Sequence, residues 1–173
     1  MAFTETDFWA LIERVDRAAL AQCNEDKAIE LVVQALQERP EADIFAFEEQ
    51  LAKALHNLDG RKYADEAGDS GNSDDGFLYT RCYVVGCGKA RYDAVLADPT
   101  LMPKTTDEWF EALLGVAQEA YESREGKEWV LHSDSELRDR QQQPSVVIRG
   151  PMRSSELFGK VILPTPLADC SIS

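Results

Sequence analysis

Apolar residues recur every three or four positions through most of the first 126 residues, which is the spacing of one face of an α-helix. The first apolar stripe runs from Phe8 to Ala19, the second from Ala28 to Ala35 and the third from Ile44 to Leu58. Asn24 is placed to cap the second helix, and Pro40 ends it. We therefore expect three amphipathic helices in the first third of the chain.

Further helices are expected in the middle of the chain. The stretch Ser73–Val85 is apolar on most sides, a pattern typical of the central helix of a bundle. A short helix is expected over Lys89–Ala97. Another is expected to begin at Thr105 or Thr106, either of which can cap it, and to end at Gly126.

The pattern changes beyond Pro144, where two short apolar runs replace the helical stripes. Residues 145–149 and 160–163 are rich in valine and isoleucine, which is typical of short β-strands. The predicted fold is therefore mainly α: a compact helical bundle of five to six helices with a short C-terminal β-hairpin or arm.

Charge divides the chain into two segments. The sequence holds 32 acidic and 18 basic residues, which gives a net charge of −14 at pH 7. Residues 134–173 contain five basic and five acidic residues, so the whole net charge lies in residues 1–133. We predict an acidic helical domain over 1–133 and a C-terminal extension over 134–173 that carries the two short strands.

This charge restricts the partners. Nucleic acids and anionic membrane surfaces both attract clustered Lys and Arg, so neither is an expected partner. The chain shows no signal-peptide pattern and no apolar run of membrane-spanning length, so we expect a cytoplasmic protein. A basic protein is the partner that a strongly acidic surface favours.

No metal or cofactor site is predicted. The histidines, His56 and His132, have no cysteine or second histidine nearby, and the four cysteines are dispersed. An EF-hand register that begins at Asp69 places Asp74 where glycine is required and Thr80 where glutamate is required. The motifs of phosphate-binding loops, dinucleotide sites and serine nucleophiles are missing from the sequence. These observations favour a non-enzymatic protein.

One block of sequence places charged residues at the start of the most apolar predicted helix. Ser73 can cap that helix, and the carboxylates of Asp74 and Asp75 in its first turn complement the helix dipole. Gly76 in the same turn costs about 1 kcal/mol relative to alanine. Its presence indicates that another part of the protein approaches this backbone closely.

The same block is the candidate binding site. Arg81 lies two turns beyond the carboxylates, so we expect it to pair with a carboxylate of another helix, such as Glu48 or Glu13. Helix capping and a ligand or partner site are alternative interpretations of the block. The candidate binding residues are Asp69, Asn72, Ser73, Asp74, Asp75, Tyr79 and Arg81.

Three blocks of the chain resemble a bacterial family, the domain of unknown function 4240 (DUF4240). They are Phe8-Trp9-x-Leu11-Ile12, Phe47-Glu48 with Leu51, and Ser73-Asp74-Asp75-Gly76-Phe77-x-Tyr79-x-Arg81. The resemblance covers about residues 6–126, and its third block is the most specific. It implies a helical fold and no established activity.

Two functions are compatible with the sequence. The first is a non-enzymatic binding module whose acidic surface docks a basic protein, such as an immunity protein that neutralises a toxin. The acidic loop at residues 59–75 is then the candidate contact. The second is a small-ligand or metal-dependent activity built on Asp74, Asp75 and Arg81. A self-associating structural protein is a third possibility.

Overall fold

The computed structural model describes residues 2–126 of the chain, and this part is mainly helical, as predicted. It contains eight α-helices and three short 3-10 helices, which are labelled η. The α-helices are α1 (Glu5–Ile12), α2 (Arg17–Leu20), α3 (Glu25–Gln37), α4 (Glu41–Asn57), α5 (Arg61–Ala64), α6 (Asp74–Gly86), α7 (Lys89–Ala97) and α8 (Val116–Glu125). The 3-10 helices are η1 (Gly68–Asn72), η2 (Pro99–Leu101) and η3 (Glu111–Gly115). The two predicted strands lie outside the described residues.

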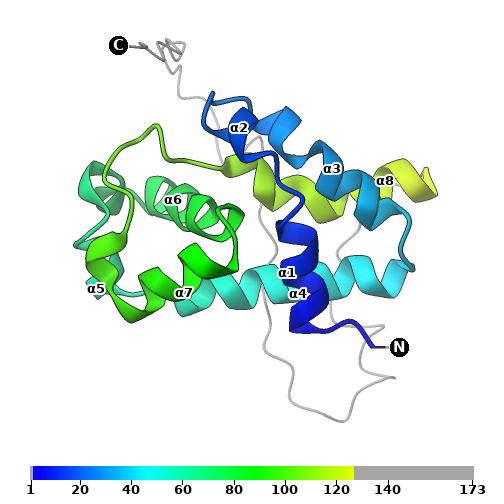
Figure 1. Cartoon of the computed structure of the whole chain (residues 1–173), viewed down its shortest axis with the longest axis horizontal. Coiled ribbons are helices and arrows are strands. Elements are labelled where there is room, and N and C mark those ends of the chain that lie inside the picture. Colours follow the sequence, from blue (N-terminus) through cyan, green and yellow to red (C-terminus); the bar gives the residue numbers. More distant parts are fainter. Residues whose placement is uncertain (1, 127–173) are drawn as a thin grey trace, which may run out of the picture. The chain divides into compact units, whose positions relative to one another are not determined.

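The longest helix, α4, is the element on which the described part is built (Figure 1). Near its N-terminal end α4 packs against α8, which lies alongside α3. Helix α1 crosses α4 and also packs on α3. Towards its C-terminal end α4 contacts α6, which in turn packs on η1, η3 and α7. Helix α6 is therefore enclosed by other elements, as its apolar sequence indicates.

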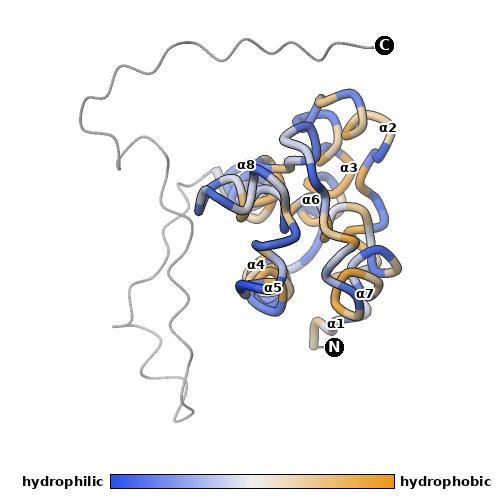
Figure 2. Tube along the Cα trace, turned by 90° about the vertical axis from the view of Figure 1, so that its left-hand side faces the viewer, coloured by the Kyte–Doolittle hydropathy of each residue, from blue (hydrophilic) through white to orange (hydrophobic). Residues whose placement is uncertain are grey.

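Aromatic and branched side chains from every long helix form the core. Figure 2 shows hydrophilic and hydrophobic residues interspersed along the helices, and most of the large hydrophobic side chains are buried. The ring of Phe8 on α1 lies 5.2 Å from that of Phe47 on α4, measured between ring centroids. The largest fully buried side chains are Phe8, Phe47, Phe110, Ile12, Leu36, Ile44, Leu51, Leu58, Met102, Leu113, Val32 and Val84.

Several predicted helix boundaries are confirmed. Asn24 caps α3 by accepting a hydrogen bond from the backbone N–H of Lys27. Helix α7 spans Lys89–Ala97 as predicted. Gly126 follows α8 with a φ of 59°, a left-handed conformation that glycine adopts without a Cβ penalty.

The first predicted helix is wrong in one respect, because its stripe is divided between two helices. Helix α1 ends at Ile12, and α2 begins at Arg17. Asp16 stands between them with extended backbone, and its carboxylate accepts hydrogen bonds from the N–H groups of Ala18 and Ala19. An aspartate that caps the next helix in this way competes with continuation of the first.

The predicted helix after Thr105 is also wrong at its start. The chain becomes helical only at Glu111, in η3, and α8 follows from Val116. Before that point the N–H of Phe110 donates to the backbone oxygen of Tyr79 in α6, at 3.1 Å. This tertiary bond and the full burial of Phe110 override the local helical pattern.

None of the helices within residues 2–126 combines the length and the apolar character needed to cross a membrane.

Candidate functional site

The N-terminus of α6 is held by a local cap, as one of the two interpretations of its sequence requires. Ser73 has extended backbone, and its hydroxyl accepts a hydrogen bond from the N–H of Gly76 at 3.3 Å. Asp74 and Asp75 occupy the first turn, and both side chains are exposed. Neither carboxylate forms a hydrogen bond or ion pair with another described residue. Both carboxylates are therefore placed to complement the helix dipole.

Gly76 has a packing role. A Cβ atom at this position would lie 3.1 Å from the carbonyl oxygen of Ser70 and 3.3 Å from a ring carbon of Trp109. These two neighbours are joined, because the indole Nε1 of Trp109 donates to the Ser70 hydroxyl at 2.8 Å. Glycine therefore allows η1 and Trp109 to close over the first turn of α6, which accounts for the close approach that the sequence predicted.

Arg81 links α6 to the C-terminal end of α4. Its Nη1 donates to the carbonyl oxygen of Leu55 at 3.1 Å and lies 3.4 Å from a carboxylate oxygen of Asp59. Its Nε donates to the carbonyl oxygen of Phe77, and the guanidinium stacks 4.6 Å from the centre of the Phe77 ring. Only 12% of the Arg81 side chain is exposed. A cation beside the last carbonyls of α4 is stabilising because it complements the negative end of the helix dipole.

The expected partners of Arg81 were therefore wrong. Glu13 pairs with Arg17, with 2.6 Å between the charged atoms. Glu48 has a buried oxygen, Oε2, without a hydrogen-bond partner among the described residues. Asp59 takes their place because it lies just beyond the end of α4, beside the carbonyl groups that Arg81 reaches.

Tyr79 points away from Arg81, towards η3. Its hydroxyl donates to Oε1 of Glu111 at 3.0 Å, and its ring lies 5.8 Å from that of Trp109. Burial and the neighbouring Glu111 carboxylate raise the pKa of Tyr79 to about 12. Tyr79 and Arg81 thus serve different contacts, and the other five candidates lie at or before the first turn of α6.

The acidic loop at residues 59–75 is partly neutralised by its own ion pairs. Asp59 pairs with Arg81, Asp65 with Arg61 and Glu66 with Lys104. Asp69 and Asn72 are exposed in η1. The loop therefore presents less unpaired negative charge than its sequence suggests.

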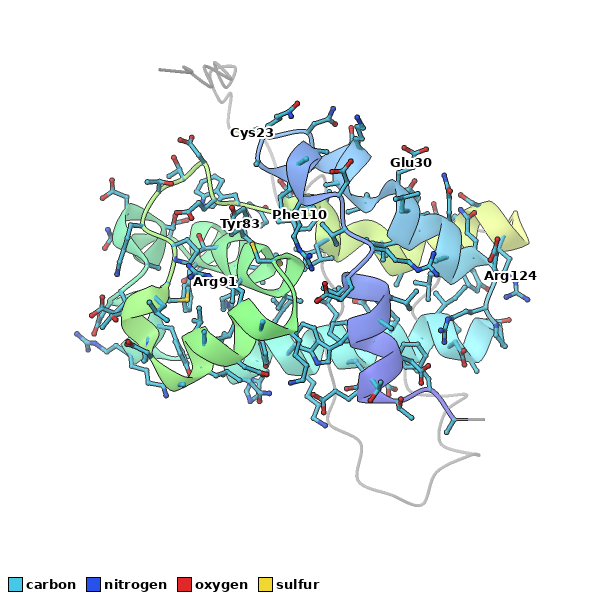
Figure 3. All side chains as sticks on the ribbon, viewed as in Figure 1. Cys23, Glu30, Tyr83, Arg91, Phe110 and Arg124 are labelled. Carbon is cyan, nitrogen blue, oxygen red and sulfur yellow. The ribbon has the colours of Figure 1, made fainter. Side chains whose placement is uncertain are left out.

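A second acidic region lies where α3 begins beside η3. An open depression of about 630 Å³ is lined by Cys23, Asn24, Glu25, Asp26, Glu111 and Ala112. Figure 3 shows Cys23 in the turn between α2 and α3 and Glu30 on the outer side of α3. A neighbouring depression of about 590 Å³ shares Asn24 and Asp26 and adds, among others, Glu30, Lys27 and Glu119.

Glu25 connects α3 to η3, which form the two sides of this region. Its carboxylate accepts a hydrogen bond from the backbone N–H of Ala112 at 2.8 Å. Burial raises the pKa of Glu25, and the neighbouring charge of Glu111 raises it further. This arrangement was not predicted, because Glu25 and Glu111 are separated by more than eighty residues and meet only through the packing of η3 on α3.

Carboxylates continue from this region to the start of α6. Glu111 accepts from Tyr79, and the charge of Asp75 also acts on the Tyr79 hydroxyl. The first depression is lined by no basic residue, and Lys27 is the basic residue in the lining of the second. We call this surface the acidic face, and it comprises Glu25, Asp26, Glu30, Asp75, Glu111 and Glu119.

Metal-binding clusters are not found in the described part of the chain. Among residues 2–126, no group of three or more His, Cys, Asp or Glu side chains is placed to hold a metal ion. Burial raises the pKa of the Cys82 thiol, which is fully enclosed in the core. A buried thiol of raised pKa is a poor nucleophile.

Comparison with known protein families matches residues 3–123 to a family described as "Protein of unknown function (DUF4240)". The chain belongs to the DUF4240 family. The match includes α1 to α7 and ends within α8. The resemblance seen in the sequence is thereby confirmed. The curated proteins and the solved structures contain no match to this DUF4240 chain.

Proposed function

We propose that this DUF4240 protein is a non-enzymatic binding module whose acidic face docks a basic protein partner in the cytoplasm. An immunity protein that neutralises a basic toxin is the most concrete form of the proposal. The observation that carries it is the acidic face. All of its carboxylates except Asp75 line two adjoining depressions, and the second depression includes Lys27 as the basic residue of the lining.

The chemistry of this face suits a cationic surface. Asp26, Glu30, Asp75, Glu111 and Glu119 are exposed, so their charges are available to a partner. The net charge of −14 adds a long-range attraction, which accelerates encounter with a basic protein and weakens as salt is added. Complementary charge also disfavours acidic competitors.

The geometry gives less support to a small-ligand or metal site at the start of α6. Ser73 is used by the helix cap, and Tyr79 and Arg81 are engaged with Glu111, Leu55 and Asp59. We therefore retain that activity only as the alternative that the partner experiment must exclude.

The experiment compares two triple charge reversals. One variant carries Asp26→Lys, Glu30→Lys and Glu119→Lys on the acidic face. The control carries Glu38→Lys, Glu41→Lys and Glu49→Lys, which are exposed acidic residues elsewhere and change the net charge equally. Each is co-expressed with the basic, toxin-like product of a neighbouring gene, and the dissociation constant is measured by calorimetry at low and high salt.

The expected result is loss of at least tenfold in affinity for the variant on the acidic face and a smaller loss for the control, because local complementarity outweighs net charge. Equal losses in both variants would show only non-specific attraction. Failure of the wild-type protein to retain any partner at low salt would overturn the proposal.

A further inference from the structure

Two aspartate–glycine pairs occur in the chain, Asp59-Gly60 and Asp75-Gly76. Such a pair is chemically labile, because the backbone nitrogen of the glycine can attack Cγ of the aspartate and close a five-membered ring. Glycine favours this attack, since it has no Cβ atom to obstruct the approach. Closure of the ring also requires the backbone to move, and the structure places the two pairs in different surroundings.

The pair Asp75-Gly76 is held rigidly. Both residues lie in the first turn of α6, where helical dihedral angles keep the glycine nitrogen away from the preceding side chain. The N–H of Gly76 donates to the Ser73 hydroxyl at 3.3 Å, and Ser70 and Trp109 pack closely against this glycine. The nitrogen of Gly76 therefore becomes free only when the start of α6 opens.

The pair Asp59-Gly60 has fewer restraints. It connects α4, which ends at Asn57, to α5, which begins at Arg61. The side chain of Asp59 is 54% exposed. The N–H of Gly60 donates to no backbone acceptor among residues 2–126, and the nearest neighbour of a Cβ atom at Gly60 would lie 3.8 Å away. An exposed connection with few contacts opens at low cost, so this backbone can reach the conformation that ring closure requires.

Arg81 restrains the reaction of Asp59 only weakly. Ring closure consumes the protonated carboxyl group, whereas the guanidinium, 3.4 Å from the carboxylate, favours the ionised form. Because half of the Asp59 side chain is exposed, solvent screens this attraction. When Asp59 moves away, the guanidinium keeps its hydrogen bonds to the carbonyl oxygens of Leu55 and Phe77.

We propose that Asp59-Gly60 is a site of spontaneous isoaspartate formation in the folded protein and that Asp75-Gly76 is not. The nitrogen of Gly60 forms a bond to Cγ of Asp59, and its proton leaves with the side-chain hydroxyl group as water. A second water molecule then opens the succinimide ring by cleaving the bond between this nitrogen and the original backbone carbonyl carbon. The main chain now runs through Cγ, and the free carboxylate is attached directly to Cα.

The product has the same mass as the starting protein, because one water molecule is lost and one is gained. Its main chain is longer by one methylene group at the connection between α4 and α5. The carboxylate that faced Arg81 is displaced, so the ion pair at the end of α4 is lost.

The experiment incubates the full chain at pH 6, in buffer and in urea. Isoaspartate at residues 59 and 75 is measured by peptide mapping with electron-transfer fragmentation. In buffer, isoaspartate is expected to accumulate at least about tenfold faster at residue 59, because the nitrogen of Gly60 is the less restrained of the two. In urea the two rates should approach each other, since neither glycine is then held by the fold.

Three variants identify the step. Gly60→Ala places a Cβ atom on extended backbone with open space around it, so the variant should fold and should slow the reaction at residue 59 about tenfold. Asp59→Asn and Asp75→Asn close the same ring with loss of ammonia and need no protonated carboxyl group. Asp59→Asn is expected to deamidate at least about tenfold faster than Asp75→Asn in buffer. A thermal melt of each variant verifies that it is folded.

Three results would overturn the inference. Equal isoaspartate formation at residues 59 and 75 in buffer would show that the sequence, and not the fold, sets the rate. An Asp59→Asn variant that stays intact in buffer and deamidates in urea would show that the fold prevents ring closure at this position. An unchanged rate in Gly60→Ala would show that residue 59 is modified by another reaction.

Discussion

Gly76 is the residue whose helix propensity and packing conflict most directly. Alanine at this position gains about 1 kcal/mol in helix propensity. The added methyl group meets the backbone of Ser70 at 3.1 Å and the Trp109 ring at 3.3 Å. Because these neighbours are held by their mutual hydrogen bond, we expect the packing cost to exceed the propensity gain. Gly76→Ala should lower the free energy of unfolding by about 1 kcal/mol in urea titrations.

Gly115 provides the matched control for this prediction. It has φ −89° and ψ −9°, which alanine adopts without strain, and a Cβ atom there meets nothing within 4 Å. Gly115→Ala should leave stability unchanged or raise it by about 0.5 kcal/mol. If Gly76→Ala is equally stabilising, η1 and Trp109 yield to the methyl group and the close-approach account is wrong.

Substitutions of Arg81 and Asp59 test whether the ion pair or the hydrogen bond to Leu55 holds α6 against α4. Arg81→Met keeps apolar volume but leaves the carbonyl oxygen of Leu55 without its donor, at a cost of about 2 kcal/mol. Asp59→Asn should cost less than about 1 kcal/mol, because 54% of the Asp59 side chain is exposed. Urea unfolding of both variants measures the difference. Equal losses would assign the linkage to the ion pair instead.

At the scale of the element, substitutions in the first turn of α6 distinguish a helix cap from a binding site. Ser73→Ala removes the acceptor for the Gly76 N–H and should cost about 1 kcal/mol of stability. Asp74→Asn and Asp75→Asn should each cost about 0.5 kcal/mol, through the helix dipole alone. Ser73→Asp, which also caps helices, is the control and should retain most of the stability.

The outcome that would contradict capping is specific. If Asp74→Asn, which lies outside the acidic face, leaves the unfolding free energy unchanged and abolishes binding of the partner, this carboxylate belongs to a contact surface and not to the cap. Stability and affinity must therefore be measured on the same preparations.

The helices show where sequence reasoning succeeds. Periodicity and caps predicted α3, α4, α6 and α7, because in these segments the apolar stripe and the local stop signals agree. Prediction failed over residues 105–110, where the backbone bond from Phe110 to Tyr79 replaces a helical bond. It also failed at Asp16, where one continuous helix was predicted from an uninterrupted apolar stripe. Asp16 instead caps a separate helix, α2. Both failures involve interactions that periodicity does not encode.

At the scale of the whole molecule, the local features of the candidate site were predicted from the sequence, and the features that depend on tertiary contacts were not. Ser73 and Gly76 were assigned sound local roles from their neighbours in sequence. The acidic face was not predicted, since Glu25 and Glu111 approach each other only after α3 and η3 have packed. Net charge indicated that an acidic surface exists, but its position is a property of the tertiary structure.

Stability of the whole protein should pass through a maximum near pH 5. Hydrogen bonds from Thr4 and Thr100 lower the pKa of Asp7 and Asp98, so these carboxylates stabilise the fold at neutral pH and lose this effect in acid. Burial raises the pKa of Glu48 and Glu25, so these residues destabilise the fold progressively as the pH rises above 4.5. These two groups of carboxylates change stability in opposite directions as the pH rises, which produces the maximum. Urea titrations at successive pH values measure it.

Glu48→Gln separates the buried carboxyl group from the general repulsion of an acidic protein. The pKa of Glu48 is about 7 in the folded protein, and its ordinary value is 4.5. Ionisation of Glu48 therefore lowers the free energy of unfolding by up to about 3 kcal/mol at neutral pH. The variant should therefore gain stability at pH 8 and change little at pH 4. Titrations in 0.5 M salt screen the surface charges but leave the buried group largely unscreened. If salt abolishes the decline in stability above pH 5, and if the wild type and Glu48→Gln are equally stable at every pH, repulsion between surface charges causes the decline and Glu48 does not.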